Sequence, residues 1–285
     1  MPASKETGPV LRWRHEALAY DTIDRARMAN EQALFYLLAI ASFIETTTDL
    51  YTRNLIEYYA GDGEIQGWLS ADWEPEELQH GKALRRYVEA VWPDFGWDEA
   101  YRSFFEEFRA CCTVELLGPT RALEMARRCI VEMGTCSYYT MIQRLSPCSV
   151  LAELTGNIRT DEAGHYRHFH SYFQRYREAE QPSRPTIAKT LAGRVREIDS
   201  EDGRIAFKHV WLANNPGRPY NDRYYRRFSR TARALAVAYY PFRMAATMAT
   251  KPLGLGPKNQ KRVATTVAMT ARLAARATGR VTAAH

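Results

Sequence analysis

Two stretches of the chain carry the same pair of side chains at the same spacing. Glu77 and His80 lie in "WEPEELQHGKAL", and Glu162 and His165 lie in "TDEAGHYRHF". On an α-helix, residues i and i+3 lie on the same face, so each pair directs a carboxylate and an imidazole toward a common point. These are metal-ligand types. Because exposed helical pairs share this spacing, the interpretation depends on finding the remaining ligands.

Two further glutamates stand alone in apolar segments. Glu45 is the only charged residue from Gln32 to Thr48, and Glu132 is the only charged residue in "CIVEMGTCSYYTMI". A buried, unpaired carboxylate is costly, so each glutamate requires a partner or a metal. Dinuclear carboxylate centres in four-helix bundles take one Glu from each of two helices and a Glu-x-x-His pair from each of the other two. The chain supplies that set in order: Glu45, Glu77, His80, Glu132, Glu162 and His165.

The charges of this ligand set favour two divalent ions. Four glutamates and two ferrous ions are formally neutral together, which suits a buried cluster in a medium of low dielectric constant. Hard carboxylates and imidazoles without clustered thiolates favour iron or manganese over a structural zinc site. The sequence therefore predicts a di-iron centre in the middle of a bundle.

The ligands fall in segments with helical periodicity, and no segment shows sustained strand alternation, so the predicted fold is all-α. Five helices are expected, over residues 25–59, 75–91, 98–118, 120–145 and 150–180. The Ser146-Pro147 step separates the last two. Beyond them, "QPSRPT" is expected to be a hinge, residues 211–228 to be irregular, and alanine-rich helices to be interrupted by "KPLGLGPKNQ".

Composition indicates one large domain with an appendage. The chain has 285 residues, of which 46% are hydrophobic and 25% are charged, as in ordinary soluble proteins. No apolar run approaches the length of a membrane span, and the N-terminal stretch lacks the apolar core of a signal peptide. The five cysteines form no CxxC pair and are expected to be reduced thiols. A cytoplasmic location and a homodimer are the expectations.

Charge is distributed unevenly along the chain. Residues 205–285 contain 15 Lys and Arg against one acid, a net charge of +14, which leaves −8 for residues 1–204. We expect a helical bundle with an N-terminal arm over residues 1–180 and a basic extension over residues 181–285. The extension either packs on the bundle or docks an acidic partner, such as a carrier protein, a ferredoxin or an anionic membrane surface. No nucleic-acid-binding motif accompanies the basic residues, so nucleic acid is not an expected partner.

Three motifs around the ligands resemble the second, third and fourth helices of soluble acyl-acyl-carrier-protein desaturases. The first has a Trp four residues before the ligand Glu, a doubled Glu and a His-Gly step. The others have a Thr three residues after the ligand Glu, and an Asp directly before it. The residues concerned are Trp73, Glu76, Glu77, His80, Gly81, Glu132, Thr135, Asp161, Glu162 and His165. The resemblance covers residues 25 to 180 approximately and does not reach the basic extension.

This resemblance implies a ferritin-like four-helix bundle with additional helices, two iron ions cycling between Fe2+ and Fe3+, and O2 as co-substrate. It also implies a ferredoxin-type electron donor and the removal of two hydrogens from an acyl chain held as a carrier thioester. In that family, the counterpart of Thr135 lies beside the oxygen site. The counterparts of Asp161 and Trp73 belong to the hydrogen-bonded shell around the ligating histidines.

Other functions remain open at the level of sequence. A di-iron oxygenase could hydroxylate or N-oxidise a small natural-product precursor, and iron storage would use the same ligands. Leu84 stands where radical-generating ribonucleotide reductase subunits keep a Tyr, which argues against that family. Three neighbours of Glu132 also have structural interpretations. Thr135 could bond back to a helix carbonyl, while Cys136 and Tyr139 could simply pack.

Overall fold

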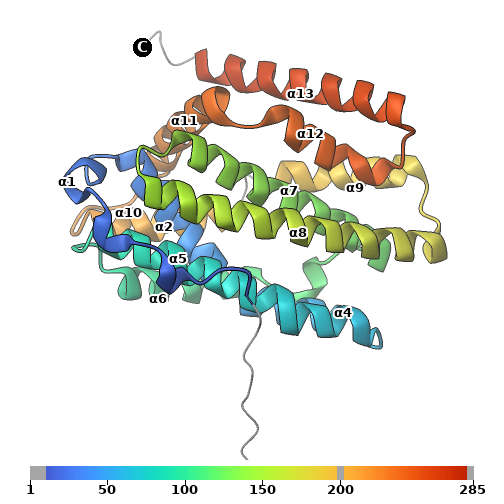
Figure 1. Ribbon diagram of the computed structural model, residues 1–285, viewed down its shortest axis with the longest axis horizontal. Coiled ribbons are helices and arrows are strands. Elements are labelled where there is room, and N and C mark those ends of the chain that lie inside the picture. Colours follow the sequence, from blue (N-terminus) through green and yellow to red (C-terminus); the bar gives the residue numbers. More distant parts are fainter. Residues whose placement is uncertain (1–10, 198–201, 281–285) are drawn as a thin grey trace, which may run out of the picture.

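The structure is a computed structural model that describes residues 11–197 and 202–280, and these residues form helices, turns and loops without a strand (Figure 1). The all-α prediction is therefore confirmed for the described residues. The first ten residues, which belong to the stretch expected to lack a signal-peptide core, lie outside them. Among the described residues, no single helix has the length and apolar content to cross a membrane. The bent pair of helices within residues 32–58 meets that test on length and composition only.

Two pairs of packed helices form the centre of the molecule. Helix α2 (Gln32–Thr46) lies along α5 (Glu74–Val91), and α7 (Arg121–Leu145) lies along α8 (Ser149–Glu180) (Figure 1). Contacts between α5 and α8 join the two pairs. Each of these four helices carries at least one of the predicted metal ligands, so the bundle brings distant parts of the sequence to one place.

The prediction of one long helix over residues 25–59 is wrong. The segment forms α1 (Arg25–Met28), α2 and α3 (Thr48–Tyr58), and α2 and α3 meet at an angle of 40°. Three consecutive threonines cause the second break, because their hydroxyls donate to backbone carbonyls one turn earlier and compete with regular helix geometry. These bonds run from Thr46 to Ser42, from Thr47 to Ile44 and from Thr48 to Glu45.

The helices that carry the two Glu-x-x-His pairs begin and end close to the predicted positions. Helix α5 follows α4 (Gly63–Trp68) and a π-helical turn (Leu69–Trp73). Pro75 and three glutamates occupy its first turn, where a missing N–H and negative charge are both favourable.

Helix α6 (Trp97–Phe108) is shorter than the predicted connecting helix, because short 3₁₀ turns replace its last residues.

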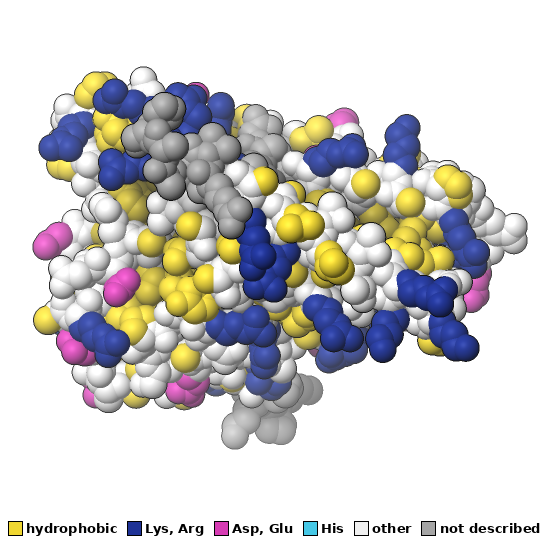
Figure 2. All heavy atoms as spheres, turned by 90° about the horizontal axis from the view of Figure 1, so that it is seen from above, with side chains coloured by type: hydrophobic (Ala, Val, Ile, Leu, Met, Phe, Trp, Pro, Cys, Tyr) yellow, Lys and Arg dark blue, Asp and Glu magenta, His cyan; other side chains and the backbone are white. Residues whose placement is uncertain are grey.

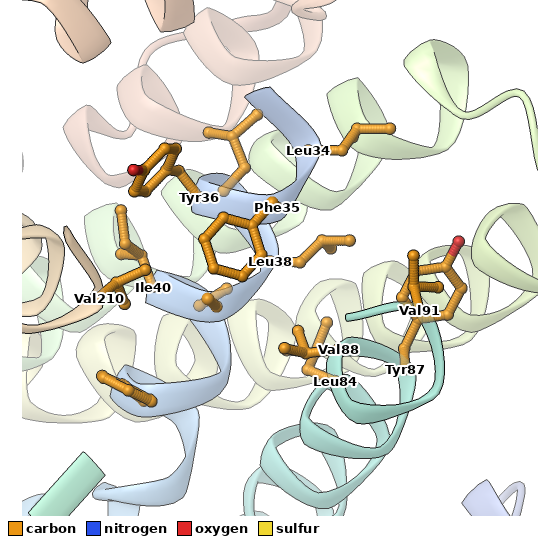
Figure 3. Close-up of a cluster of buried hydrophobic side chains, with 14 of the residues drawn as sticks. Leu34, Phe35, Tyr36, Leu38, Ile40, Leu84, Tyr87, Val88, Val91 and Val210 are labelled. Carbon is orange, nitrogen blue, oxygen red and sulfur yellow. The ribbon is translucent and has the colours of Figure 1, made fainter. Parts of the chain in front are cut away.

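Apolar side chains of α2 form the largest part of the core. Leu34, Phe35 and Leu38 face Tyr87 and neighbouring apolar residues of α5 (Figure 3). On its other side, α2 packs against α10 (Asp202–Asn214). Because α2 is covered on both sides, Glu45 near its C-terminal end is surrounded by protein rather than solvent.

The basic extension is helical almost throughout. The predicted hinge contracts to a few residues after Gln181, whose left-handed φ of 48° ends α8. Residues 211–228 are not irregular as expected, because Trp211 stacks on Tyr224 with ring centroids 4.3 Å apart and holds two helices together across a short turn. The predicted interruption at "KPLGLGPKNQ" is confirmed. The helices are α9 (Arg184–Glu197), α10, α11 (Asp222–Tyr239), α12 (Phe242–Thr250) and α13 (Pro257–Arg280).

These helices pack on the bundle in layers. Helix α10 contacts α2 and α6, whereas α9 and α12 contact α7. Helix α13 lies on α11 and α12 as the outermost layer (Figure 1). An ion pair between Lys208 and Glu107, with 2.7 Å between Nζ and Oε2, joins the extension to α6. The extension therefore covers one side of the bundle, while the domain boundary at residue 180 stays a prediction.

Candidate metal centre

The structure brings all six predicted ligands together inside the bundle. They come from α2, α5, α7 and α8, and each has an exposed fraction of 7% or less. Two overlapping groups form, in each of which the ligand atoms lie within 4.8 Å of one another. Glu77 and Glu162 belong to both groups. The first group adds Glu45 and His80, and the second adds Glu132 and His165. Two adjacent ions could therefore share two carboxylates.

Both imidazoles direct Nδ1 toward the centre. Nδ1 of His80 lies 3.3 Å from Glu77 and 3.4 Å from Glu162. Nδ1 of His165 lies 3.1 Å from Glu77. The opposite nitrogens, Nε2, contact carboxylates outside the cluster, namely Asp161 at 3.1 Å from His80 and Glu76 at 2.7 Å from His165. Such outer carboxylates fix the tautomer and orientation of metal-binding histidines.

The donor atoms fit a cation. Both carboxylate oxygens of Glu132 are buried, and neither has a hydrogen-bond partner among the described residues. Burying an unsatisfied carboxylate is unfavourable unless a positive charge compensates it. The two groups of ligand atoms contain carboxylates and imidazoles only, and Cys136, one turn after Glu132, instead contacts the backbone carbonyl of Arg159. The residues present therefore suit a metal that prefers oxygen and nitrogen ligands.

The pKa values of the cluster reflect the same excess of buried carboxylates. Burial raises the pKa of Glu45 and of Glu132 well above the ordinary value, and neighbouring carboxylates raise both further. Burial also opposes the charge of Glu77, but hydrogen bonds from His165 and His80 outweigh burial and lower the pKa of Glu77. Burial disfavours both imidazolium ions, yet their acidic partners raise the pKa of His80 and His165. Protons thus occupy sites at which metal ions would displace them.

Two side-chain hydroxyl groups donate hydrogen bonds to carboxylates of the cluster. Thr135 donates its hydroxyl to Oε2 of Glu162 at 2.6 Å, and the Tyr139 hydroxyl donates to Oε1 of Glu45. Thr135 also lies close enough to bond back to the carbonyl of Glu132 at 3.2 Å, so its structural interpretation and its contact with a ligand coexist. Tyr139 forms part of an aromatic wall and also bonds a ligand.

Asp161 contacts Nε2 of His80, one of the predicted ligands, at 3.1 Å. Its carboxylate also accepts hydrogen bonds from the indole of Trp13 at 2.6 Å and from Arg12 at 2.8 Å. Trp73 instead approaches His165 edge-on, with ring centroids 6.4 Å apart, and its buried indole N–H has no hydrogen bond among the described residues. A tryptophan from the N-terminal arm therefore makes the hydrogen bond that was expected from Trp73.

An apolar cavity of about 380 Å³ borders one side of the cluster. Glu45, Thr135 and Tyr139 line it on the metal side. Its walls come from α2, α7, α9 and α11, and the start of α10 also lines it. The other lining residues include Leu37, Ile40, Ala41, Ile44, Val131, Tyr138, Phe228, Tyr240, Arg194 and Asp202. Its volume lies in the range of pockets for small ligands or a segment of a longer one.

No protein-family model matches the chain, and a search of curated proteins finds no match. The class of the protein is therefore defined by its own residues. It is a helical bundle with a buried carboxylate and histidine cluster that could hold metal ions beside an apolar cavity.

Proposed function

We propose that the protein is a ferritin-like di-iron oxidase that uses O2 to desaturate an acyl chain, held as a carrier-protein thioester. The observation that carries this proposal is the position of the cluster at the wall of an apolar cavity, where Glu45 and Thr135 face the space available to a substrate. A purely structural metal site would be closed on all sides by protein, whereas a catalytic site needs an open position.

In this proposal, Glu45, Glu77, His80, Glu132, Glu162 and His165 hold two iron ions. The iron pair, when bound, supplies activation of O2 and two-electron oxidation. Asp161 and Glu76 keep the imidazoles oriented through Nε2. Thr135 holds a proton in a hydrogen bond to Glu162, next to the cavity. The apolar walls exclude water and align a saturated chain beside the cluster.

Electrons would come from a ferredoxin-type donor. A hollow of about 340 Å³ between the N-terminal arm, α5 and α8 is lined by Trp68, Glu76, His165 and His168. The ring of Trp68 stacks on His168 with centroids 4.9 Å apart and lies edge-on to His165. We propose this hollow as the docking position of the electron donor, because the molecular surface there lies close to His165, a predicted metal ligand.

A second candidate is a di-iron oxygenase that hydroxylates or N-oxidises a small natural-product precursor. The polar end of the cavity, where Arg194, Glu197 and Asp202 lie, favours this candidate, because a short substrate with polar groups could fill the cavity completely. Iron storage is disfavoured, because oxidation of the metal alone does not require an apolar cavity at the centre.

The test combines metal content with product mass. Purified protein loaded anaerobically with ferrous iron should contain about two iron ions per chain, and Glu162→Ala or His80→Ala should lower that number. A candidate acyl-carrier thioester is then incubated with reduced enzyme and O2. Loss of two hydrogens indicates the oxidase, gain of one oxygen indicates the oxygenase, and no change indicates neither. Folded wild-type protein that takes up no iron would contradict the proposal.

A further inference from the structure

The outer layer of the extension carries positive charge without compensating acids. Helix α13 contains six Lys and Arg and no Asp or Glu. Five of these cations are exposed and form no ion pair with a described residue, namely Lys258, Lys261, Arg262, Arg272 and Arg276. Figure 2 shows the face formed by this layer, on which basic side chains spread between apolar ones and acidic side chains lie near the margins.

Apolar side chains point outward between these cations. Met269 is 62% exposed and Leu273 is 60% exposed, and their spacing of four residues places them on one face of α13. Arg262 and Arg276 lie on the same face at helical spacing. A helix with exposed apolar residues flanked by Lys and Arg, and without acids, is typical of a segment that lies in the interface of an anionic bilayer.

A groove of about 1090 Å³ opens beside this face, between α12 and α13. Its lining includes the apolar Phe242, Met244 and Met248 and cations from three helices, among them Arg144 and Arg243. Apolar lining suits acyl chains, and cations suit the phosphate groups of lipids. The groove thus matches the two halves of an anionic lipid.

Tyr240 connects this groove with the metal centre. It is a lining residue both of the groove and of the cavity that Glu45 and Thr135 border. It occupies the short junction between α11 and α12, lies edge-on to Phe242 with centroids 5.1 Å apart, and directs its hydroxyl toward Met133 of α7, with 4.0 Å between Oη and Sδ. Tyr240 is therefore the residue shared by the linings of the surface groove and of the cavity beside the cluster.

We propose that the face formed by α12 and α13 seats on an anionic membrane, that the groove takes up an acyl chain of a membrane phospholipid, and that Tyr240 gates its passage to the metal-side cavity. The role of the gate rests on the proposed function, with a membrane phospholipid in place of the carrier thioester as the source of the acyl chain, whereas membrane seating does not rest on it. A bilayer fits better than an acidic protein because the cations extend over a broad face (Figure 2) and the apolar side chains of Met269 and Leu273 stand out between them.

Vesicle flotation tests the seating. Full-length protein should float with vesicles that contain phosphatidylglycerol and not with vesicles of phosphatidylcholine alone, and binding should weaken as salt rises. Replacing four exposed cations of α13 by Glu should reduce binding by about 100-fold, because each cation near an anionic leaflet contributes several-fold. The variant carries Lys258→Glu, Arg262→Glu, Arg272→Glu and Arg276→Glu.

A matched control reverses four exposed cations on α1, α5 and α6, and it should bind as the wild type does. These are Arg25→Glu, Arg27→Glu, Lys82→Glu and Arg102→Glu. Failure of the wild type to float at low salt, or an equal loss in the control, would overturn the proposal. Saturable binding of an acidic acyl carrier protein without vesicle binding would overturn it too and would assign the face to a protein partner.

Photo-crosslinking tests the gate. Phosphatidylglycerol with a diazirine on its acyl chain should label groove peptides containing Met244 and cavity peptides containing Ile44. Tyr240→Trp should retain the groove label and lose the cavity label, while Tyr240→Phe should behave as the wild type. Equal cavity labelling in Tyr240→Trp would contradict the gate. Neither experiment requires turnover. Successful flotation and labelling without an oxidised product would therefore reject the proposed reaction but support the proposal that the face formed by α12 and α13 binds a membrane.

Discussion

Glu162 combines two tasks at the centre. It belongs to both ligand groups, and its Oε2 accepts the hydroxyl of Thr135 at 2.6 Å. A carboxylate that is shared by two ions needs a fixed orientation, and one hydrogen bond from the cavity side supplies part of it. Thr135 is thus a residue that contacts the predicted metal site and also lines the cavity proposed for the substrate.

We predict that Thr135→Val retains about two iron ions per chain but consumes more O2 per product than the wild type, because the proton held at Glu162 is lost while the side-chain volume is kept. Oxygen uptake measured against product by mass spectrometry checks this. Thr135→Ser should restore coupling. Thr140→Val is the matched control, because Thr140 lies on the same helix and bonds only the Cys136 carbonyl. Equal coupling in Thr135→Val and wild type would reduce Thr135 to a structural residue.

The six residues of the buried cluster were predictable because a lone carboxylate in an apolar helix and a repeated Glu-x-x-His step are local signals. Trp13 and Arg12 were not, because their contacts with Asp161 join residues about 150 positions apart. Trp13 also lies outside any helix, so no periodicity marked it as a contact. Only the position of the N-terminal arm across α5 and α8 reveals it.

At the scale of helices, Gly81 sets the distance between α2 and α5. A Cβ atom added there would lie 2.6 Å from Oγ1 and 2.9 Å from the backbone nitrogen of Thr46. The two helices are therefore in close contact beside Glu45 and His80, each of which directly precedes one of these two contact residues in the chain. Gly164, next to His165 on α8, has ordinary space around it.

We predict that Gly81→Ala forces α2 and α5 apart, lowers the free energy of unfolding by about 1–3 kcal/mol and reduces iron content, because backbone atoms of Thr46 cannot yield as a side chain can. Gly164→Ala should be neutral or stabilising, since Ala favours helix over Gly. Chemical denaturation and metal analysis of both variants measure the difference. Equal behaviour of the two variants would show that the close approach does not position the ligands.

Helices with strong apolar periodicity and clear breaks, such as α7 and α8, were predictable to within a residue or two. The break inside residues 25–59 was not, because it depends on three threonine hydroxyls that compete with the helix for carbonyls. The hairpin of α10 and α11 was missed for another reason. Its stability depends on contacts between rings in two segments, such as Trp211 with Tyr224, and composition alone suggested a loop.

At the scale of the whole molecule, the cluster couples stability to pH. Glu45 and Glu132 have pKa values raised above the ordinary 4.5, and His80 and His165 have pKa values raised above the ordinary 6.5. A raised pKa means that the folded protein binds more protons than the unfolded chain between the two values. The stability contributed by each group is therefore lost as pH rises through that interval.

We predict that the melting temperature of metal-free protein falls as pH rises from about 5 to about 8, because in this range the unfolded carboxyl groups and then the unfolded imidazoles lose protons that the folded protein retains. Loading with ferrous iron should reverse the trend, because metal binding releases those protons and becomes stronger at higher pH. Calorimetry of metal-free and loaded samples checks both signs. A combined Glu132→Gln and His165→Gln variant should show a flatter dependence without metal. A metal-free melting temperature that rises across this range would contradict the assignment.

The sharing of Glu77 and Glu162 has a consequence for assembly. Each ligand group draws on α5 and α8, so neither helix pair can complete a metal site by itself. Each ion would therefore bind residues of both helix pairs and hold the two pairs together. Loading must follow docking of the two pairs, and the first ion would preorganise the shared carboxylates for the second, so half-loaded molecules should be scarce. Removal of metal should weaken the packing between the two helix pairs, which lowers the near-ultraviolet circular dichroism signal. The far-ultraviolet signal, which reports helical content, should persist.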